Sequence, residues 1–103
     1  MKTVREISPL ENTLMIVGKK FDLQIIDSIN KNGNKARFNQ IAKDISSINP
    51  RILSMRLKEL EKNKLIEKHL ILGTPVKTEY SLSKKALSLI EIIDKLKNWG
   101  ENN

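Results

Sequence analysis

Basic, hydroxyl and amide side chains recur at helical spacing between positions 49 and 63, and such side chains suit contact with nucleic acid. Asn49-Pro50 is typical of a helix start, because asparagine caps free N–H groups and proline fits the first helical position. In the helix that follows, four side chains lie to one side of the leucine stripe: Arg51, Ser54, Met55 and Lys58. Arginine and serine bond base edges, whereas lysine more often contacts phosphate. This face predicts a DNA-reading surface; the alternative is a solvated basic face, with Met55 either on a thymine methyl or packed inward.

Further candidate DNA contacts flank this helix in sequence. They are Arg37, Asn39, Ser46, Ser47, Asn49, Lys68, His69 and Lys77. The amides and hydroxyls among them can donate to phosphates or can cap helices and turns, and one residue can do both. The lysines could equally serve solubility. Arg56 lies at the edge of the leucine stripe, so we expect it to pair with Glu59 or Asp44 instead of DNA.

Other chemistries find little support in the sequence. The chain has no cysteine and one histidine, which argues against disulfides, thiol nucleophiles and a zinc site. No paired carboxylates, Gly-rich phosphate loop or nucleophile–base pair stands out. We therefore expect no metal, no cofactor and no enzymatic activity.

The net charge favours nucleic acid as the partner. The formal charge is +7, and residues 31–60 hold seven basic side chains against two acidic ones. A small basic domain commonly binds nucleic acid. At 103 residues and 39% hydrophobic content the sequence predicts one domain, 1–103, with a single core. No apolar run reaches the roughly 20 residues of a membrane span, and Met1-Lys2-Thr3-Val4-Arg5-Glu6 does not resemble a signal peptide, so we expect a cytoplasmic protein with no membrane partner.

The order of expected elements is that of a winged helix-turn-helix, a mainly α fold with a β-hairpin. Apolar periodicity and caps predict helices at 8–18 and 21–30 and a short strand at 35–38. A helix capped by Asn39 and the helix that ends at Asn63 form the expected helix-turn-helix pair, 39–63. Alternating residues around Gly73-Thr74-Pro75 predict a two-stranded wing at 66–82, and Ser83 caps a last helix at 84–99.

The first and last helices carry apolar residues beyond the needs of the helix-turn-helix unit. Those expected to pair two copies are Leu10, Leu14, Leu89, Ile93, Leu96 and Trp99. Small domains often use such helices for symmetric pairing. The alternative is that Trp99 and the aliphatic stripe merely complete the core of one copy.

Three blocks of the sequence resemble the HxlR-type winged helix-turn-helix transcriptional regulators, a branch of the MarR-like group. The first is Ser8-Pro9-Leu10-Glu11 through Gly18-Lys19-Lys20-Phe21. The second runs from Arg37-Phe38-Asn39-Gln40-Ile41 through Asn49-Pro50-Arg51-Ile52-Leu53-Ser54, and the third from Leu65-Ile66-Glu67-Lys68 to Lys77-Thr78-Glu79-Tyr80. The resemblance implies a DNA-binding regulator that is dimeric through its terminal helices.

The sequence departs from the family pattern at several positions. Ser8 replaces a cysteine that several members use to sense oxidants or electrophiles, and Phe21 replaces a tryptophan. The loop at 31–36 is slightly longer than usual. Lys64 replaces a glycine that closes the recognition helix, so we expect Asn63 or Lys64 to adopt a left-handed conformation.

Together these features predict a homodimeric, sequence-specific regulator of transcription that binds double-stranded DNA. The helix that ends at Asn63 would enter the major groove, and the wing would lie on the backbone or in the minor groove. The sequence indicates no particular small-molecule effector. The alternative function is a winged-helix module for protein–protein assembly or for non-specific chromosome binding, which would not need a basic reading face.

Overall fold

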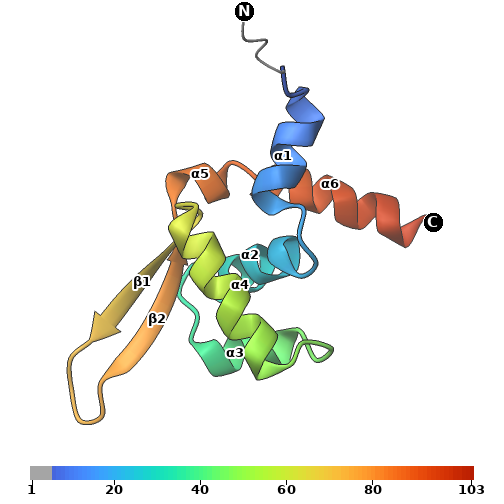
Figure 1. Cartoon of the computed structure of the whole chain (residues 1–103). Coiled ribbons are helices and arrows are strands. Elements are labelled where there is room, and N and C mark those ends of the chain that lie inside the picture. The colour runs from blue at the N-terminus through green and yellow to red at the C-terminus, as the bar shows by residue number, and fades with distance from the viewer. Residues whose placement is uncertain (1–5) are drawn as a thin grey trace, which may run out of the picture.

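The computed structural model describes residues 6–103 and shows a small helical body from which three elements project (Figure 1). The N-terminal stretch in which we expect no signal peptide lies largely outside these residues. The elements in chain order are α1 (Pro9–Val17), α2 (Asp22–Lys31), α3 (Phe38–Asp44), α4 (Pro50–Lys62), β1 (Ile66–Ile71), β2 (Lys77–Leu82), α5 (Lys84–Leu87) and α6 (Ile90–Glu101). This order confirms a winged helix-turn-helix fold, with α3 and α4 as the paired helices and β1–β2 as the wing.

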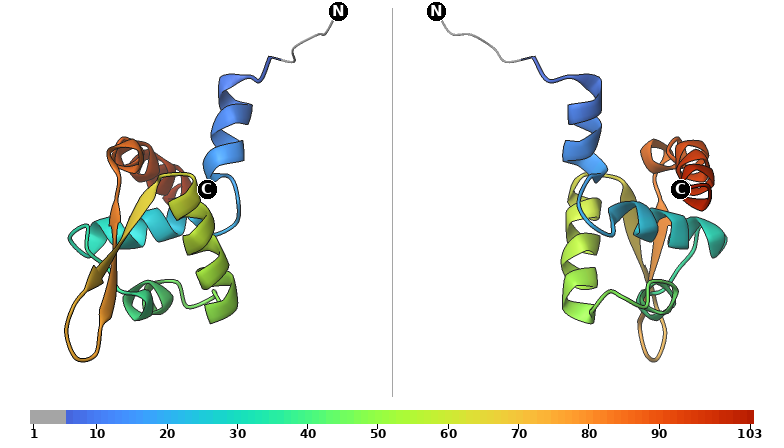
Figure 2. Two further views of the ribbon diagram at one scale, coloured as in Figure 1. Left: turned by 60° about the vertical axis from the view of Figure 1, so that its left-hand side comes forward. Right: turned by 90° about the vertical axis from the view of Figure 1, so that its right-hand side faces the viewer.

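The molecule is extended for its size. Its radius of gyration is 15.4 Å, against about 13 Å for a compact chain of this length. Figures 1 and 2 show the reason: α1 and the wing project in opposite directions from the body, and α6 starts near the body end of α1 and runs outward across its direction. A chain folded around one core would not need these projections for its own stability.

The core lies where α2, α3, α4 and the base of the wing meet. Leu53, Leu57 and Leu60 are buried, as the leucine stripe predicts. They pack with aliphatic residues of α2 and α3, which include Ile25, Ile26, Ile29 and Ile41. The antiparallel register joins Ile66 to Leu82 and Ile71 to Lys77, so the wing is buried at its base and free at its tip.

Three predicted helix caps and the predicted left-handed residue after α4 are confirmed. The Ser8 hydroxyl accepts from the Glu11 N–H at 3.1 Å, the Asn49 Oδ1 from the Ile52 N–H at 2.8 Å, and the Ser83 hydroxyl from the Ala86 N–H at 3.3 Å. Lys64 is left-handed, with φ of 61°. It therefore takes the conformation for which the family commonly supplies glycine.

The start of α3 differs from the prediction. Asn39 is not the cap, because α3 begins at Phe38 and Arg37 occupies the cap position. The predicted strand at 35–38 is a single bridge in which Ala36 and Tyr80 exchange two backbone hydrogen bonds. This bridge holds the chain extended up to Arg37, whose N–H donates to the Gln40 side chain at 2.8 Å, so the helix starts two residues earlier than predicted.

Two other helix boundaries also differ from the prediction. Phe21 precedes α2 in a left-handed conformation (φ of 80°), where we expected the first helical residue. The helix predicted at 84–99 is divided into α5 and α6. Leu89 donates to the Ala86 carbonyl, and the Ser88 hydroxyl bonds the Lys85 carbonyl, so a tighter turn interrupts the α-helical pattern.

A buried ion pair joins α4 to the start of α2. The Arg56 guanidinium donates to both carboxylate oxygens of Asp22, at 2.8 and 3.0 Å, and the Asp22 side chain is 0% exposed. The prediction that Arg56 pairs with Glu59 or Asp44 is therefore wrong. Asp44 instead accepts from the Ser28 hydroxyl at 2.7 Å, and this hydrogen bond lowers the pKa of Asp44.

The ion pair generates a prediction about stability. Arg56→Ala leaves the Asp22 carboxylate buried without its charge partner, and we expect a loss of about 3–5 kcal/mol in the free energy of unfolding. Urea denaturation followed by circular dichroism measures this loss. Lys58→Ala, an exposed position in the same helix, is the control and should stay within about 0.5 kcal/mol of the wild type. Equal losses in the two variants would contradict the role given to the pair.

Candidate nucleic-acid interface

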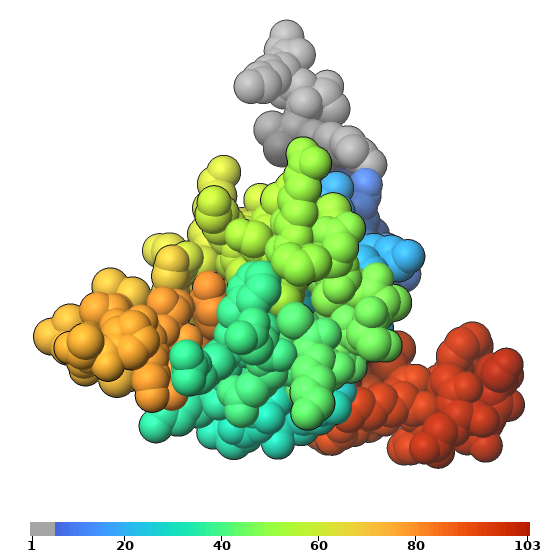
Figure 3. Space-filling view, turned by 90° about the horizontal axis from the view of Figure 1, so that it is seen from below, coloured from blue at the N-terminus to red at the C-terminus, as the bar shows by residue number. Residues whose placement is uncertain are grey.

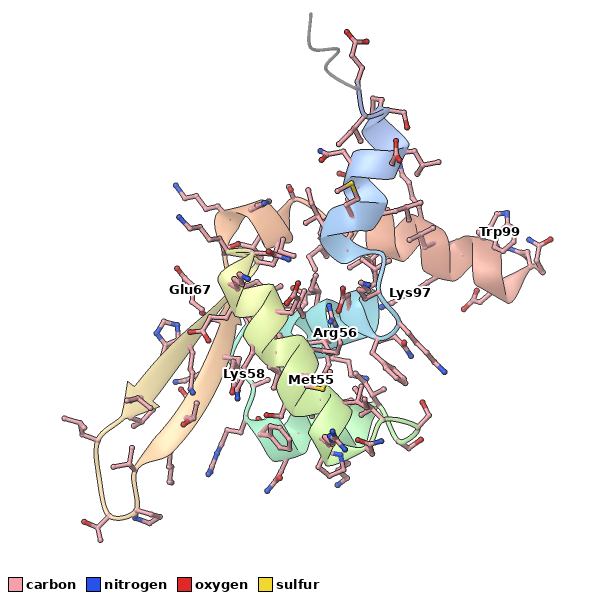
Figure 4. The ribbon with its side chains drawn as sticks, viewed as in Figure 1. Met55, Arg56, Lys58, Glu67, Lys97 and Trp99 are labelled. Atoms are coloured by element: carbon pink, nitrogen blue, oxygen red, sulfur yellow. The ribbon has the colours of Figure 1, made fainter. Side chains whose placement is uncertain are left out.

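The exposed side of α4 carries the side chains that the sequence singles out. Arg51, Met55 and Lys58 are exposed and Ser54 is half-buried. Met55 is 52% exposed, which excludes the alternative that it packs inward. Figure 4 shows Met55 and Lys58 away from the contact with α2, while Arg56 lies at that contact. The helix thus separates a core side, a side fixed by an ion pair and an open polar side.

The connection between α3 and α4 adds hydroxyls and an amide to this surface. Ser46 and Ser47 are exposed. Asn49 is exposed too, although the Oδ1 oxygen of its side-chain amide caps α4. Its amide N–H groups remain able to donate to a ligand, so capping and binding are compatible at this residue.

A polar groove of about 450 Å³ lies between the start of α3 and β2. Its lining brings together three candidates that are distant in sequence: Arg37, Asn39 and Lys77. Gln40 and Thr78 also line the groove and were not singled out by the sequence. The Ala36–Tyr80 bridge, a long-range contact without a local signal, brings these two segments side by side.

The remaining wing candidates are exposed along β1. Lys68 faces solvent. The His69 Nε2 lies 2.8 Å from the Ser81 hydroxyl on the neighbouring strand, which orients the imidazole ring. Among residues 6–103, no group of three or more His, Cys, Asp or Glu side chains is placed to hold a metal ion.

The basic side chains of this surface are not engaged by acidic ones. Within the described part of the chain, Arg37, Arg51, Lys58, Lys68 and Lys77 form no ion pair. Figure 3, which views the molecule from below, shows α3 and α4 between the wing and α6. Part of the positive charge that no ion pair compensates among residues 6–103 therefore lies at the start of α3, on α4 and on the wing, where it can attract a polyanion.

The other end of the molecule is apolar. Leu10, Leu14 and Leu96 are exposed and line a groove of about 570 Å³ between α1, α2 and α6. Trp99 is 69% exposed near the end of α6 (Figure 4), which excludes the alternative that it completes the core. Leu89 is half-buried and Ile93 is only 5% exposed, so these two pack mainly within the domain.

Two exposed residues of this apolar surface were not predicted from the sequence. Met15 and Ile92 are more than half exposed. Ile92, Leu96 and Trp99 are spaced i, i+4, i+7 within the predicted helix, and this spacing could have revealed an outward stripe that includes Ile92. Within residues 6–103, no helix is long and apolar enough to cross a bilayer.

Comparisons with known proteins agree with this geometry. The family model described as "HxlR-like helix-turn-helix" matches residues 16–103. The HTH-type transcriptional regulator YodB of Bacillus subtilis is 33% identical over 89% of this chain and 80% of its own length.

Solved structures give the same result. The redox regulator HypR in its oxidized form superposes with a TM-score of 0.83 at 33% identity, covering 93% of this chain and 97% of HypR. A MarR-family regulator structure from Porphyromonas gingivalis W83 reaches a TM-score of 0.86 at 28% identity, covering 100% and 99% of the two chains. With the paired helices, the wing and the family match in agreement, the chain belongs to the HxlR-like helix-turn-helix family.

Proposed function

We propose that this protein is a transcriptional regulator that binds specific sites on double-stranded DNA as a homodimer in the cytoplasm. The observation that carries the proposal is the set of five exposed basic side chains at the start of α3, on α4 and on the wing that have no acidic partner among residues 6–103. A module used only for protein assembly would not need such a surface. Family membership supports the same function.

In this proposal α4 enters the major groove, whose width of about 12 Å admits an α-helix. Arg51 and Ser54 reach base edges, with Met55 beside them. Lys58 contacts the backbone, as do the donors of the α3–α4 connection. Arg37, Asn39 and Lys77 hold a neighbouring phosphate from the groove between α3 and β2. Lys68 and His69 add contacts from the wing.

The proposed dimer forms through α1 and α6. Apolar side chains on both helices are exposed, and a soluble monomer rarely exposes a large continuous apolar surface. Two-fold pairing would place two copies of α4 on the same side of the assembly, about 34 Å apart for adjacent half-sites of one DNA turn.

Arg51 tests the reading face. Arg51→Ala should weaken binding to the best duplex by about 1–3 kcal/mol and relax the sequence preference, because the variant cannot bond to base edges at this position. Selection of duplexes from a random pool, followed by fluorescence anisotropy, measures both effects. If the variant keeps the wild-type affinity and preference, the reading face is misplaced.

Lys68 and Lys77 test the contribution of charge. Lys68→Ala or Lys77→Ala should weaken binding to all duplexes alike and reduce the salt dependence by roughly one unit for each phosphate that a subunit no longer neutralises. Titrations at several salt concentrations, on the selected duplex and on an unrelated one, give the slopes. A change confined to the selected duplex would indicate base reading by the wing instead.

The terminal helices test the dimer. The wild-type protein should be dimeric at micromolar concentration by light scattering. Trp99→Asp should produce monomers, because a charge would then be desolvated between apolar helices. Asn98→Asp, an exposed substitution on the same helix that changes the charge by the same one unit and lies away from the stripe of Ile92, Leu96 and Trp99, is the control for the introduced charge. A wild-type protein that remains monomeric would refute the architecture.

A further prediction is that the protein does not sense its signal through a thiol. Disulfides and thiol adducts need a cysteine, and the chain has none. Diamide should therefore leave DNA binding unchanged, which a gel-shift assay would show. Ser8→Ala should cost about 1 kcal/mol of stability through removal of the helix cap, without altering the preferred DNA sequence.

Reversible loss of binding in diamide, restored by a reductant, would contradict that prediction. Mass spectrometry is needed beside the gel shift, because oxidation of Met15 or Met55, both exposed, could also change binding.

A further inference from the structure

The tip of the wing, residues 70–76, is apolar and open to solvent. Its sequence is Leu-Ile-Leu-Gly-Thr-Pro-Val, with no charged residue. The exposed fractions are 64% for Leu70, 41% for Ile71, 86% for Leu72 and 55% for Val76. These residues project beyond the core, so their apolar character contributes little to the stability of the domain.

Three of the four apolar side chains share one face of the hairpin. Side chains alternate along a strand, and the register pairs Leu70 with Thr78 and Ile71 with Lys77. Leu72 and Val76 are the next residues beyond the two strands, and continued alternation would set them opposite each other on the face of Leu70. Leu70, Leu72 and Val76 then form an apolar patch on the same face as Lys68, whereas Lys77 pairs with Ile71 on the opposite face.

This patch is continuous with the surface assigned above to DNA. Val76 lines the same groove as Arg37 and Lys77. The tip points away from α1 and lies on the side of the molecule that α3 occupies (Figures 1 and 3). A dimer formed through α1 and α6 would leave it uncovered.

We propose that the wing tip is an apolar wedge that enters the DNA minor groove, with Leu72 and Val76 in contact with sugar and base-pair edges. The inference rests on the proposed function and specifies how the wing contributes to it. Apolar side chains in the minor groove can part a base step and bend the duplex by about 20–90°. Lys68 lies on the face of the patch and Lys77 on the opposite face, so the two lysines are placed toward the phosphates on the two sides of such a groove.

The charge around the patch favours DNA over a second copy of this chain. Two wing tips in contact would bring together two pairs of lysines in a protein whose net charge is already +7. The same lysines are attracted to the phosphates on both sides of a minor groove. DNA thus accommodates the apolar patch and the two lysines together.

The wedge has a signature that charge interactions lack. Removing a cation that neutralises a phosphate reduces the slope of log affinity against log salt concentration, because fewer counterions are released. Removing an apolar side chain from the interface lowers the affinity and leaves that slope unchanged. A wedge that parts a base step also makes the bend angle depend on the apolar side chains.

The test uses the full chain with Leu72→Ser and Val76→Ser combined. We expect binding to the selected duplex about tenfold weaker or more, an unchanged salt slope and a smaller bend by fluorescence energy transfer. Leu87→Ser, an exposed leucine on α5, is the matched control and should keep affinity and bend. Lys77→Ala should show the opposite pattern, with a reduced slope. Thermal melting verifies that the variants are folded.

The outcomes separate this inference from the proposed function. If the wild type binds a selected duplex and the double variant matches it in affinity and bend, the wedge is refuted and DNA binding stands. If the double variant changes the oligomeric state and not the bend, the patch is an interface between copies and the wedge is again refuted. If the wild type binds no duplex, the proposed function itself fails and the wedge with it.

Discussion

The orientation of the recognition helix depends on one buried interaction, the pair between Asp22 and Arg56. A stripe of leucines alone tolerates small rotations of α4, since aliphatic contacts have no preferred direction. Two hydrogen bonds from one guanidinium to one carboxylate do not tolerate such rotations, because both groups are planar and the Asp22 side chain is 0% exposed. Buried pairs of this kind add little net stability compared with apolar packing, and their best-attested role is to fix one arrangement among several. Here that arrangement turns Met55 and Lys58 outward.

The same ion pair gives different roles to two arginines that the sequence pattern alone hardly distinguishes. Arg51 and Arg56 lie in one helix, yet Arg56 is committed to the interior and Arg51 is exposed. The sequence indicates that Arg56 has an acidic partner, but not which one. Asp22 is 34 residues away, and its proximity follows from the packing of α2 against α4. Local reasoning can only offer acids that are near in sequence, and Asp44 is already held by Ser28 and Asn32.

Features with a local physical cause could be predicted from the sequence, and features that depend on tertiary contacts could not. The caps at Ser8, Asn49 and Ser83 and the left-handed Lys64 each depend on a few neighbouring residues, and all were predicted correctly. The start of α3 was wrong because the Ala36–Tyr80 bridge, across 44 positions, determines it. The groove that unites Arg37 with Lys77 was invisible for the same reason. The sequence could not decide whether Trp99 is buried or exposed in one copy of the chain. An apolar stripe has the same sequence pattern whether the same chain or a second copy covers it.

The fold also determines which of the excess basic side chains stay unpaired and exposed. Of the seven basic residues between 31 and 60, Lys31, Lys35 and Arg56 form ion pairs. The other four, Arg37, Lys43, Arg51 and Lys58, lie at the start of α3 or on α3 and α4, all exposed. The ion pairs thus leave the unpaired charge of this segment at or on α3 and α4, and charge of this kind attracts any duplex regardless of sequence. In the function proposed above, discrimination between duplexes must then come from side chains held at a fixed angle and from the shape of the wing. The ion pair between Arg56 and Asp22, which fixes the angle of α4, would then serve specificity as well as folding.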